Sequence, residues 1–245
     1  MRTVEIRTRD GQRIALNHYD ARGGRTALIL AHGFFNAKDA YLFRALAEEL
    51  GTEYDCVVFD FRGHGKSSGL FSWTARERFD LRAAVDYTQG CGYLSIGLIG
   101  FSLGAAVGIL ETAENPAINS LISVSAPSDI YKIDYHFWKK GMWEDLKLNV
   151  GCKGKGKGIR PGNPFLAKVP PVQVVARIAP RPVLFIHGED DWLINVRHSR
   201  WLFARAAEPK KLVIIEGGGH AEKLFDDQHD LFMRVCREWL AGVFL

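Results

Sequence analysis

Short apolar runs alternate with stretches of helical periodicity along most of the chain. Val4–Arg7 and Ile14–Tyr19 alternate apolar and polar residues, which is typical of a half-exposed hairpin. Thr26–Ala31 is a continuous apolar run, as expected for a strand buried on both faces, and Lys38–Leu50 then has helical spacing. Further strands are expected at Cys56–Phe61, Leu94–Gly100, Ile118–Ser123, Pro182–His187 and Leu212–Glu216. Further helices are expected at Thr74–Thr88, Leu103–Ala113, Asn195–Ala207 and Phe225–Leu240.

This alternation predicts an α/β fold. Strands that alternate with helices form a mostly parallel sheet covered by helices on both faces, here with eight strands and an antiparallel N-terminal pair. The 245 residues fit a single domain spanning 1–245. The alternation of strands and helices is interrupted at about residues 128–179, which we predict to be an inserted cap segment over the carboxyl edge of the sheet.

The predicted cap segment also carries the basic charge of the chain. The formal net charge is +4, yet nine basic and only three acidic residues lie between Lys132 and Lys168, so this stretch holds +6 and the remainder −2. Three of the basic residues alternate with glycine in a Lys-Gly tract at residues 153–158, namely Lys153, Lys155 and Lys157. Such a tract predicts a solvated loop, with an anion site as the alternative.

Several classes of protein are excluded by what the sequence lacks. No apolar run approaches the roughly 18 residues that span a bilayer, and Met1–Asp10 has no apolar signal region, so a cytoplasmic location is expected. The four cysteines lie far apart without metal-ligand spacing, and Cys56 and Cys236 fit core positions. No nucleotide-binding glycine motif follows the first parallel strand. We expect no cofactor, no metal, no nucleic-acid partner and no membrane partner, and the oligomeric state stays open.

A candidate nucleophile lies in the sequence Gly100-Phe-Ser102-Leu-Gly104, which matches G-x-S-x-G. A second match surrounds Ser67, so the pattern alone decides little. Context separates the two serines. Ser102 follows a predicted strand directly and opens a predicted helix, which is the sharp turn that presents a nucleophilic serine, whereas Ser67 lies in a loop. Ser102 is therefore the predicted nucleophile.

A nucleophilic serine needs a base and an acid that orients it. In this architecture the chain order is serine, acid, histidine, each after a strand. His220 follows the last predicted strand on a glycine-rich loop and is the candidate base. Asp190 and Asp191 follow the preceding strand, and Asp129 follows the strand before it, so three aspartates are candidates for the acid.

An oxyanion hole completes such a site with backbone N–H donors. One donor is expected from Leu103, the residue after the nucleophile, and the other from Phe34 in the loop after the first parallel strand. Gly33 lets that loop turn tightly.

With these motifs the chain resembles the α/β-hydrolase superfamily over nearly its whole length. Within the superfamily it is most similar to small bacterial esterases of the cinnamoyl/feruloyl-esterase-like group. The matching stretches are His32-Gly-Phe34, Asp60-Phe-Arg-Gly-His-Gly65, Gly69-Leu-Phe71, the turn at Ser102, His187-Gly-Glu-Asp-Asp191 and Gly219-His220. The resemblance implies that Asp191 is the acid, because it is four residues after the histidine of the H-G-x-x-D stretch. The chain departs from those esterases in its Lys-Gly tract and cap sequence.

Other residues near these motifs receive structural expectations. His32, His64 and His187 are expected to tie loops together rather than act as bases, and Asp60 and Arg62 to form an ion pair or brace their loop. Cys152 is treated as incidental. The candidates for lining a substrate pocket are aromatic, with cap packing as the alternative. They are Phe35, Tyr135, Trp138, Trp143 and Trp192.

Taken together, the sequence predicts a serine hydrolase that cleaves small-molecule carboxylic esters. A thioesterase or acyltransferase would use the same three residues, and the basic segment favours an anionic leaving group such as coenzyme A. A peptidase is less favoured because no additional domain restricts access. A non-catalytic binding protein with this fold is the alternative of another class.

Overall fold

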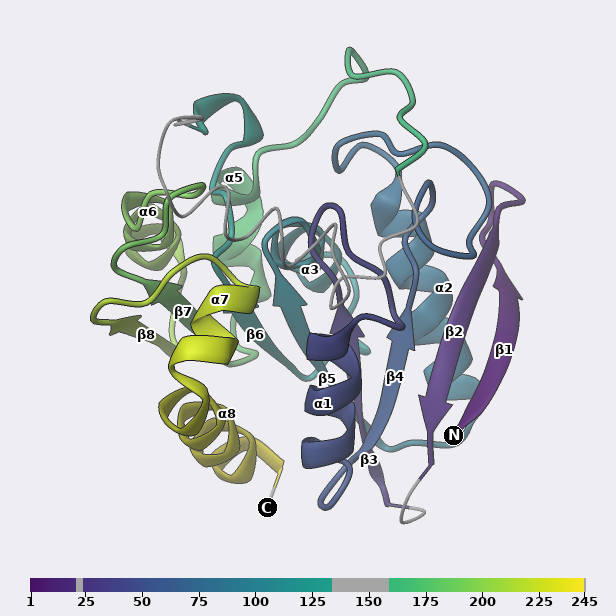
Figure 1. Ribbon diagram of the computed structural model, residues 1–245, viewed down its shortest axis with the longest axis horizontal. Helices are drawn as coiled ribbons and strands as arrows, with labels where there is room; N and C mark the ends of the chain where they lie inside the picture. Colours follow the sequence, from purple (N-terminus) through teal and green to yellow (C-terminus); the bar gives the residue numbers. More distant parts are fainter. Residues whose placement is uncertain (21–23, 134–158, 245) are drawn as a thin grey trace.

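The structure is a computed structural model, and it describes residues 1–20, 24–133 and 159–244. Its centre is an eight-stranded sheet with the order β1-β2-β4-β3-β5-β6-β7-β8 (Figure 1). The strands are β1 Arg2–Arg7, β2 Arg13–Tyr19, β3 Thr26–Ala31, β4 Asp55–Phe59, β5 Ser95–Phe101, β6 Ser120–Val124, β7 Val183–Gly188 and β8 Lys210–Ile215. The helical elements are α1 Tyr41–Leu50, α2 Glu77–Gly90, α3 Leu103–Thr112, η1 Ile130–Lys132, α5 Pro171–Val174, η2 Val175–Ile178, α6 Arg197–Arg205, α7 Glu222–Asp227 and α8 His229–Phe244.

The strand directions confirm the predicted sheet. β1 and β2 pair antiparallel, β2 joins β4 antiparallel, and every pair from β4 to β8 is parallel. β1 is an edge strand whose residues alternate between exposed and half-buried, as its sequence pattern predicts. β3 and β4 are buried almost throughout because helices cover both of their faces. The carboxyl ends of the parallel strands therefore meet at one edge, where ligands of open α/β sheets bind.

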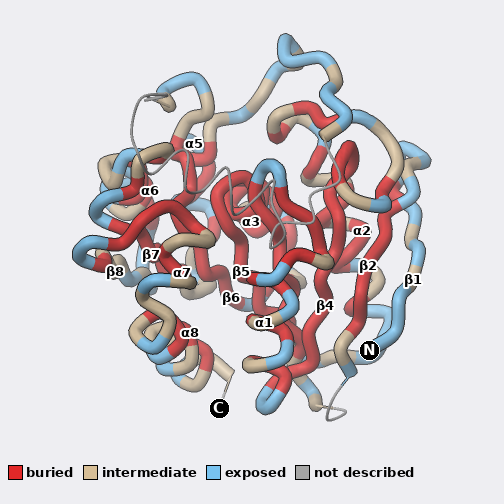
Figure 2. Tube along the Cα trace, in the orientation of Figure 1, coloured by how far each residue is buried: buried red, intermediate tan, exposed pale blue. Residues whose placement is uncertain are grey.

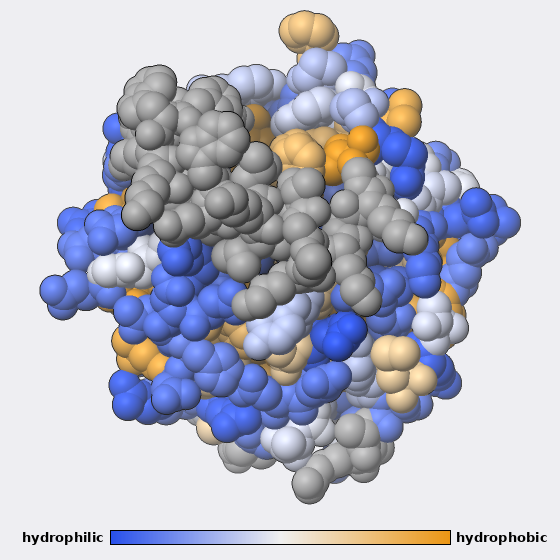
Figure 3. Space-filling model, viewed as in Figure 1, coloured by the Kyte–Doolittle hydropathy of each residue, from blue (hydrophilic) through white to orange (hydrophobic). Residues whose placement is uncertain are grey.

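Neighbouring residues of one strand face different helices. Leu28 and Leu30 belong to a core cluster with residues of α1 and α8, whereas Ile29 packs in a second cluster with residues of α2 and α3. Figure 2 shows the buried strands between these two helical layers, with the exposed segments outside. The described part of the surface in Figure 3 is mainly hydrophilic, with smaller separate apolar areas. No helix in the described ranges is long and apolar enough to cross a membrane.

The predicted helices differ from the structure mainly at their ends: the helix predicted at Thr74–Thr88 is α2, Glu77–Gly90, and the helix predicted at Asn195–Ala207 is α6, Arg197–Arg205. The predicted helix Phe225–Leu240 is two helices, α7 and α8, because Gln228 leaves helical geometry with φ −126° and ψ 34°. The helix predicted from Lys38 begins instead at Tyr41, because Ala40 is extended, with φ −67° and ψ 155°.

The cap segment remains a prediction. Residues 134–158 lie outside the described part of the chain, and so do the Lys-Gly tract and Cys152. Around them the structure describes only short elements, η1 before the gap and α5 and η2 after it.

Candidate active site

Ser102 occupies the turn between β5 and α3. Its φ of 50° and ψ of −109° place a non-glycine residue in the left-handed region, a strain that is typical of a nucleophile turn. Glycine is required on both sides of it. A Cβ on Gly100 would lie 2.6 Å from the carbonyl oxygen of Gly104, and one on Gly104 would collide with the backbone of Ala31. The turn thus fixes Ser102 at the carboxyl edge of the sheet, where it is 7% exposed.

His220 and Asp191 form a hydrogen-bonded pair at the same edge. Asp191 follows β7, His220 follows β8, and 2.8 Å separates His220 Nδ1 from Asp191 Oδ2. The loops that carry them also meet through a hydrogen bond from the Asp190 N–H to the Gly218 carbonyl, 2.9 Å long. Because the Nδ1–H of His220 donates its hydrogen bond to the Asp191 carboxylate, the imidazole keeps its proton on Nδ1 and Nε2 is free to accept a proton.

Asp191 is held as a carboxylate by four groups. Its Oδ1 accepts the backbone N–H groups of Leu193 and Ile194 at 3.0 and 2.8 Å, and its Oδ2 lies 3.2 Å from Nε2 of His187. Burial by itself raises the pKa of Asp191, but the charges and hydrogen bonds of His220 and His187 outweigh it and hold the pKa below its usual range. The carboxylate therefore remains ionised and can orient the imidazole at neutral pH.

Backbone contacts bring the serine and histidine loops together. The Ser102 N–H donates to the carbonyl of Val124 at 2.8 Å. The next residue, Ser125, is fully buried and accepts the N–H of Ala221 through Oγ at 3.4 Å. Ser125 and Ala221 have φ values of 52° and 38°, so backbone strain is present in all three loops that converge here.

The expected oxyanion donors lie beside Ser102. Leu103 is the first residue of α3, so its N–H has no acceptor within the helix. Gly33 approaches the nucleophile closely, since a Cβ there would lie 3.4 Å from Cβ of Ser102. Phe34 follows Gly33, is 37% exposed, and precedes Phe35, whose φ is 60°. The structure thus brings both predicted donors to the carboxyl edge around Ser102.

The three loop histidines make the structural contacts that were expected. His32 accepts the Phe61 N–H at 3.0 Å through Nε2, and burial, followed by the charge of His64, holds its pKa well below the usual range. His64 Nδ1 donates to the Arg62 carbonyl at 3.1 Å, and burial lowers its pKa to about 4. His187 bonds to Ser199 and to the Ile194 carbonyl.

Of the two expectations for Asp60 and Arg62, the ion pair between them is wrong, and the loop brace is confirmed for Asp60. Arg62 instead binds Asp80 and Asp10, with side-chain contacts from 2.7 to 3.1 Å. Asp60 braces its loop by accepting the N–H groups of Lys38 and Lys66 at 2.7 and 2.8 Å. The reason is geometric: Asp60 points toward the backbone of the neighbouring loop, while Arg62 points toward α2.

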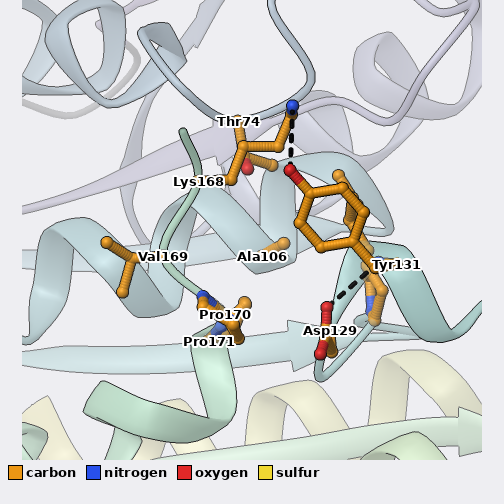
Figure 4. Close-up of a pocket in the computed structure, with 10 residues that line it drawn as sticks. Thr74, Ala106, Asp129, Tyr131, Lys168, Val169, Pro170 and Pro171 are labelled. Carbon is orange, nitrogen blue, oxygen red and sulfur yellow. Dashed lines mark hydrogen bonds between the residues drawn. The ribbon is translucent and has the colours of Figure 1, made fainter. Parts of the chain in front are cut away.

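The other two candidates for the acid have different surroundings. Asp190 is exposed, and Asp129 accepts the N–H of Tyr131 at 3.0 Å as the cap of η1. Asp129 and Tyr131 line a small cavity of about 10 Å³ together with Ala106 and Lys168, enough for about one water molecule (Figure 4). This cavity lies one helical turn beyond Ser102 along α3, and it is too small for an acyl group.

Of the expected pocket aromatics, Phe35 and Trp192 can be placed. The ring of Trp192 meets that of His220 edge-on, with 6.3 Å between centroids. Phe35 is 41% exposed and packs edge-on against Phe34 at 4.4 Å. Trp192 therefore lies beside the candidate base, and Phe35 lies on the loop that follows Gly33, while a role of either ring in a substrate pocket stays a prediction. Tyr135, Trp138 and Trp143 are outside the described ranges, so their role in a pocket stays a prediction.

A larger hollow of about 1080 Å³ lies beside β2 and the start of α1. Its lining mixes positive and negative side chains, including Lys38, Asp39, Lys66 and Glu48. None of the three candidate catalytic residues lines it. Within residues 1–20, 24–133 and 159–244, no cluster of three or more His, Cys, Asp or Glu side chains could hold a metal ion.

Two residues near the site were not predicted from the sequence. Ser125 binds the backbone beside His220, and Glu222, two residues after His220, binds Asn36 in the Gly33 loop. An acidic residue so close to the candidate base was the available signal for Glu222. No pattern distinguished Ser125 from other serines at strand ends.

Comparison with known proteins places this geometry in a family. The family profile described as "Alpha/beta hydrolase family" matches residues 28–235. The chain belongs to the alpha/beta hydrolase family. Among curated relatives, it is 27% identical to the uncharacterized protein YqkD of Bacillus subtilis, over 91% of this chain and 75% of that one. It is 29% identical to the uncharacterized protein Rv2307c of Mycobacterium tuberculosis, over 89% and 72%.

Solved structures share the fold of this family member. The esterase Pf2001 of Pyrococcus furiosus is 23% identical, with a TM-score of 0.76 over 100% of this chain and 93% of that one. Est1E of Butyrivibrio proteoclasticus, solved with ferulic acid bound, is 19% identical, with a TM-score of 0.73 over 98% of each chain. At these identities the likeness concerns the fold.

Proposed function

We propose that this alpha/beta hydrolase cleaves carboxylic esters through an acyl-enzyme intermediate. The observation that carries the proposal is the 2.8 Å hydrogen bond between His220 and an ionised Asp191, at the sheet edge where Ser102 occupies a strained turn. Serine, acid and histidine in this order on successive loops form the machinery of nucleophilic acyl transfer.

The reaction has two halves. Ser102 Oγ attacks the ester carbonyl while His220 Nε2 takes its proton, and the N–H groups of Phe34 and Leu103 bind the resulting oxyanion. His220 then protonates the leaving alcohol as the carbon–oxygen bond breaks, which leaves an ester between Ser102 and the acyl group. Water, deprotonated by His220, attacks this ester, and the acid departs as the proton returns to Ser102. Asp191 keeps the imidazole in the required tautomer and stabilises the imidazolium.

Removal of the nucleophile tests the proposal. Ser102→Ala should lower kcat on p-nitrophenyl esters about 10⁶-fold, by analogy with other serine triads. The matched control is Ser67→Ala, at the second G-x-S-x-G sequence. Ser67 bonds to the backbone of Ala15 and Asp60, so this variant should lose stability yet keep its turnover once folded. Ester hydrolysis by Ser102→Ala at the wild-type rate would refute the proposal.

The substrate class can be narrowed by a screen. The fold likeness to Est1E makes hydroxycinnamate esters the first candidates, and small acyl groups the second. The Lys-Gly tract favours acyl-coenzyme A if the leaving group is anionic, so a rate on acyl-coenzyme A above that on neutral esters would indicate a thioesterase. A fluorophosphonate probe distinguishes the non-catalytic alternative, because only an activated Ser102 reacts with it.

A further inference from the structure

Glu222 links the loop of the candidate base to the loop of the candidate oxyanion donor. It is the first residue of α7, two residues after His220. Its Oε1 accepts a hydrogen bond from Nδ2 of Asn36, a residue 186 positions away in the chain. A Cβ on Gly33 would lie 3.8 Å from the same Oε1 and 3.4 Å from Cβ of Ser102. The carboxylate therefore lies directly beside the loop that approaches the nucleophile.

The geometry of Asn36 gives this link a fixed polarity. Asn36 is 2% exposed, and its Oδ1 accepts the N–H of Ala37 at 2.9 Å. This contact orients the amide so that Nδ2 faces Glu222. Burial raises the pKa of Glu222, with His220 and Asn36 acting in the opposite direction and Asp226 reinforcing the effect of burial. Asn36 is thus buried and Glu222 half-buried, so the bond lies at the boundary between the interior and the surface.

The loop that Asn36 anchors requires support. Phe35, between the oxyanion donor Phe34 and Asn36, has a φ of 60°, a conformation that is costly for a residue with a side chain. His32 fixes the beginning of this loop through Phe61. The bond between Asn36 and Glu222 fixes its end, and it does so against the segment that carries His220.

We propose that Glu222 is a positioning residue, which holds the Phe34 N–H in register with Ser102 and His220 through its hydrogen bond to Asn36. The inference rests on the proposed ester hydrolysis. An oxyanion donor acts mainly in the transition state, so its displacement lowers kcat and leaves KM nearly unchanged. Displacements of about 1 Å in such sites cost up to about 100-fold in rate.

Four variants test whether the link needs a hydrogen-bond donor at position 36 and an acceptor at position 222. Glu222→Ala should lower kcat about 10- to 100-fold with KM within about threefold of wild type. Glu222→Gln should stay within about threefold in kcat, because its carbonyl oxygen still accepts from Asn36. Asn36→Asp places a carboxylate against Glu222 and should be as impaired as Glu222→Ala. Combining Asn36→Asp with Glu222→Gln restores a donor opposite an acceptor and should recover most of the activity.

The control is Asp227→Asn, which changes an acid on the same helix that pairs with Lys223, and it should leave kcat unchanged. Thermal unfolding identifies any variant that fails to fold. If a single variant does fail, the comparison of the double variant, Asn36→Asp with Glu222→Gln, against Asn36→Asp decides the test. Wild-type kcat in Glu222→Ala, or an exchanged pair no better than Asn36→Asp alone, would overturn the inference. If Ser102→Ala also retained full activity, the proposed function would fail instead, so the two failures are distinguishable.

Discussion

Asp191→Asn offers the sharpest test of the candidate site. The asparagine oxygen can still accept the N–H groups of Leu193 and Ile194, so the loop keeps those contacts. The new amide, however, donates toward His220 Nδ1, where the carboxylate accepts at 2.8 Å. The imidazole then favours the tautomer with its proton on Nε2, which cannot take a proton from Ser102. The same exchange in a serine protease lowers kcat about 10⁴-fold, or about 5.5 kcal/mol of transition-state stabilisation.

The assay is hydrolysis of a p-nitrophenyl ester at pH 7 to 8, with Asp190→Asn as the matched control. Asp190 is adjacent and exposed, so its variant should retain the wild-type kcat. Asp191→Asn should also lower the free energy of unfolding, because the contacts of the charged Oδ2 with His220 and His187 are replaced. Hydrogen bonds to a charged group are worth about 1.5 to 3 kcal/mol each. Equal activity of the two variants, with both folded, would show that Asp191 does not orient the base and would refute the reasoning.

Three further predictions concern stability and charge. His64→Asn, which keeps a donor for the Arg62 carbonyl, should unfold with less pH dependence than wild type between about pH 6.5 and 4. The pKa of His64 is lowered to about 4, so the unfolded chain binds the proton first, and the wild type should lose about 3 kcal/mol more than the variant as pH falls through this window. An equal change in the free energy of unfolding of both proteins, measured by urea unfolding across this range, would contradict the argument. Asp80→Ala should lower the free energy of unfolding, measured in urea, by about 3 to 5 kcal/mol, because it leaves the buried charge of Arg62 without its buried partner. Asp10→Ala removes the other partner of Arg62, which is 28% exposed, and should cost about 1 kcal/mol. Equal losses would mean that burial does not set the strength of these pairs. If the lysines of the Lys-Gly tract act on substrate, raising salt should lower kcat/KM for anionic esters and leave neutral esters unchanged, and a flat response for both would return the tract to a solvated loop.

The sequence predicted the sheet well because its strands are short apolar runs of similar length, which lie between stretches of helical periodicity. β3 matches its predicted range, Thr26–Ala31, and both predicted N-terminal strands are present. The helix ends were harder to predict than the strands. α7 ends at Gln228 through a change of backbone conformation, and no proline or glycine in the sequence marks it. Local patterns carry periodicity, and they do not carry the tertiary contacts that end an element.

For the candidate site, the order of residues along the chain predicted which residues take part, but the sequence did not predict which side chains pair with each other. Ser102 and His220 could be chosen because each follows a predicted strand, and Asp191 is the aspartate that meets His220. The sequence could not predict that Arg62 pairs with Asp80 and Asp10, because ion-pair partners depend on where side chains point after the layers pack. Glu222 was missed for the same reason.

The long-range contacts at the carboxyl edge have a consequence for how the protein refolds. His220 meets Asp191 across 29 residues, and Glu222 meets Asn36 across 186, so the first and last loops of the parallel sheet must both be in place. Pairings this distant form slowly, because the chain must close large loops before they contribute stability. Recovery of the proposed esterase activity after dilution from denaturant should therefore lag behind recovery of the helical signal, and it would report when the C-terminal segment packs on the sheet.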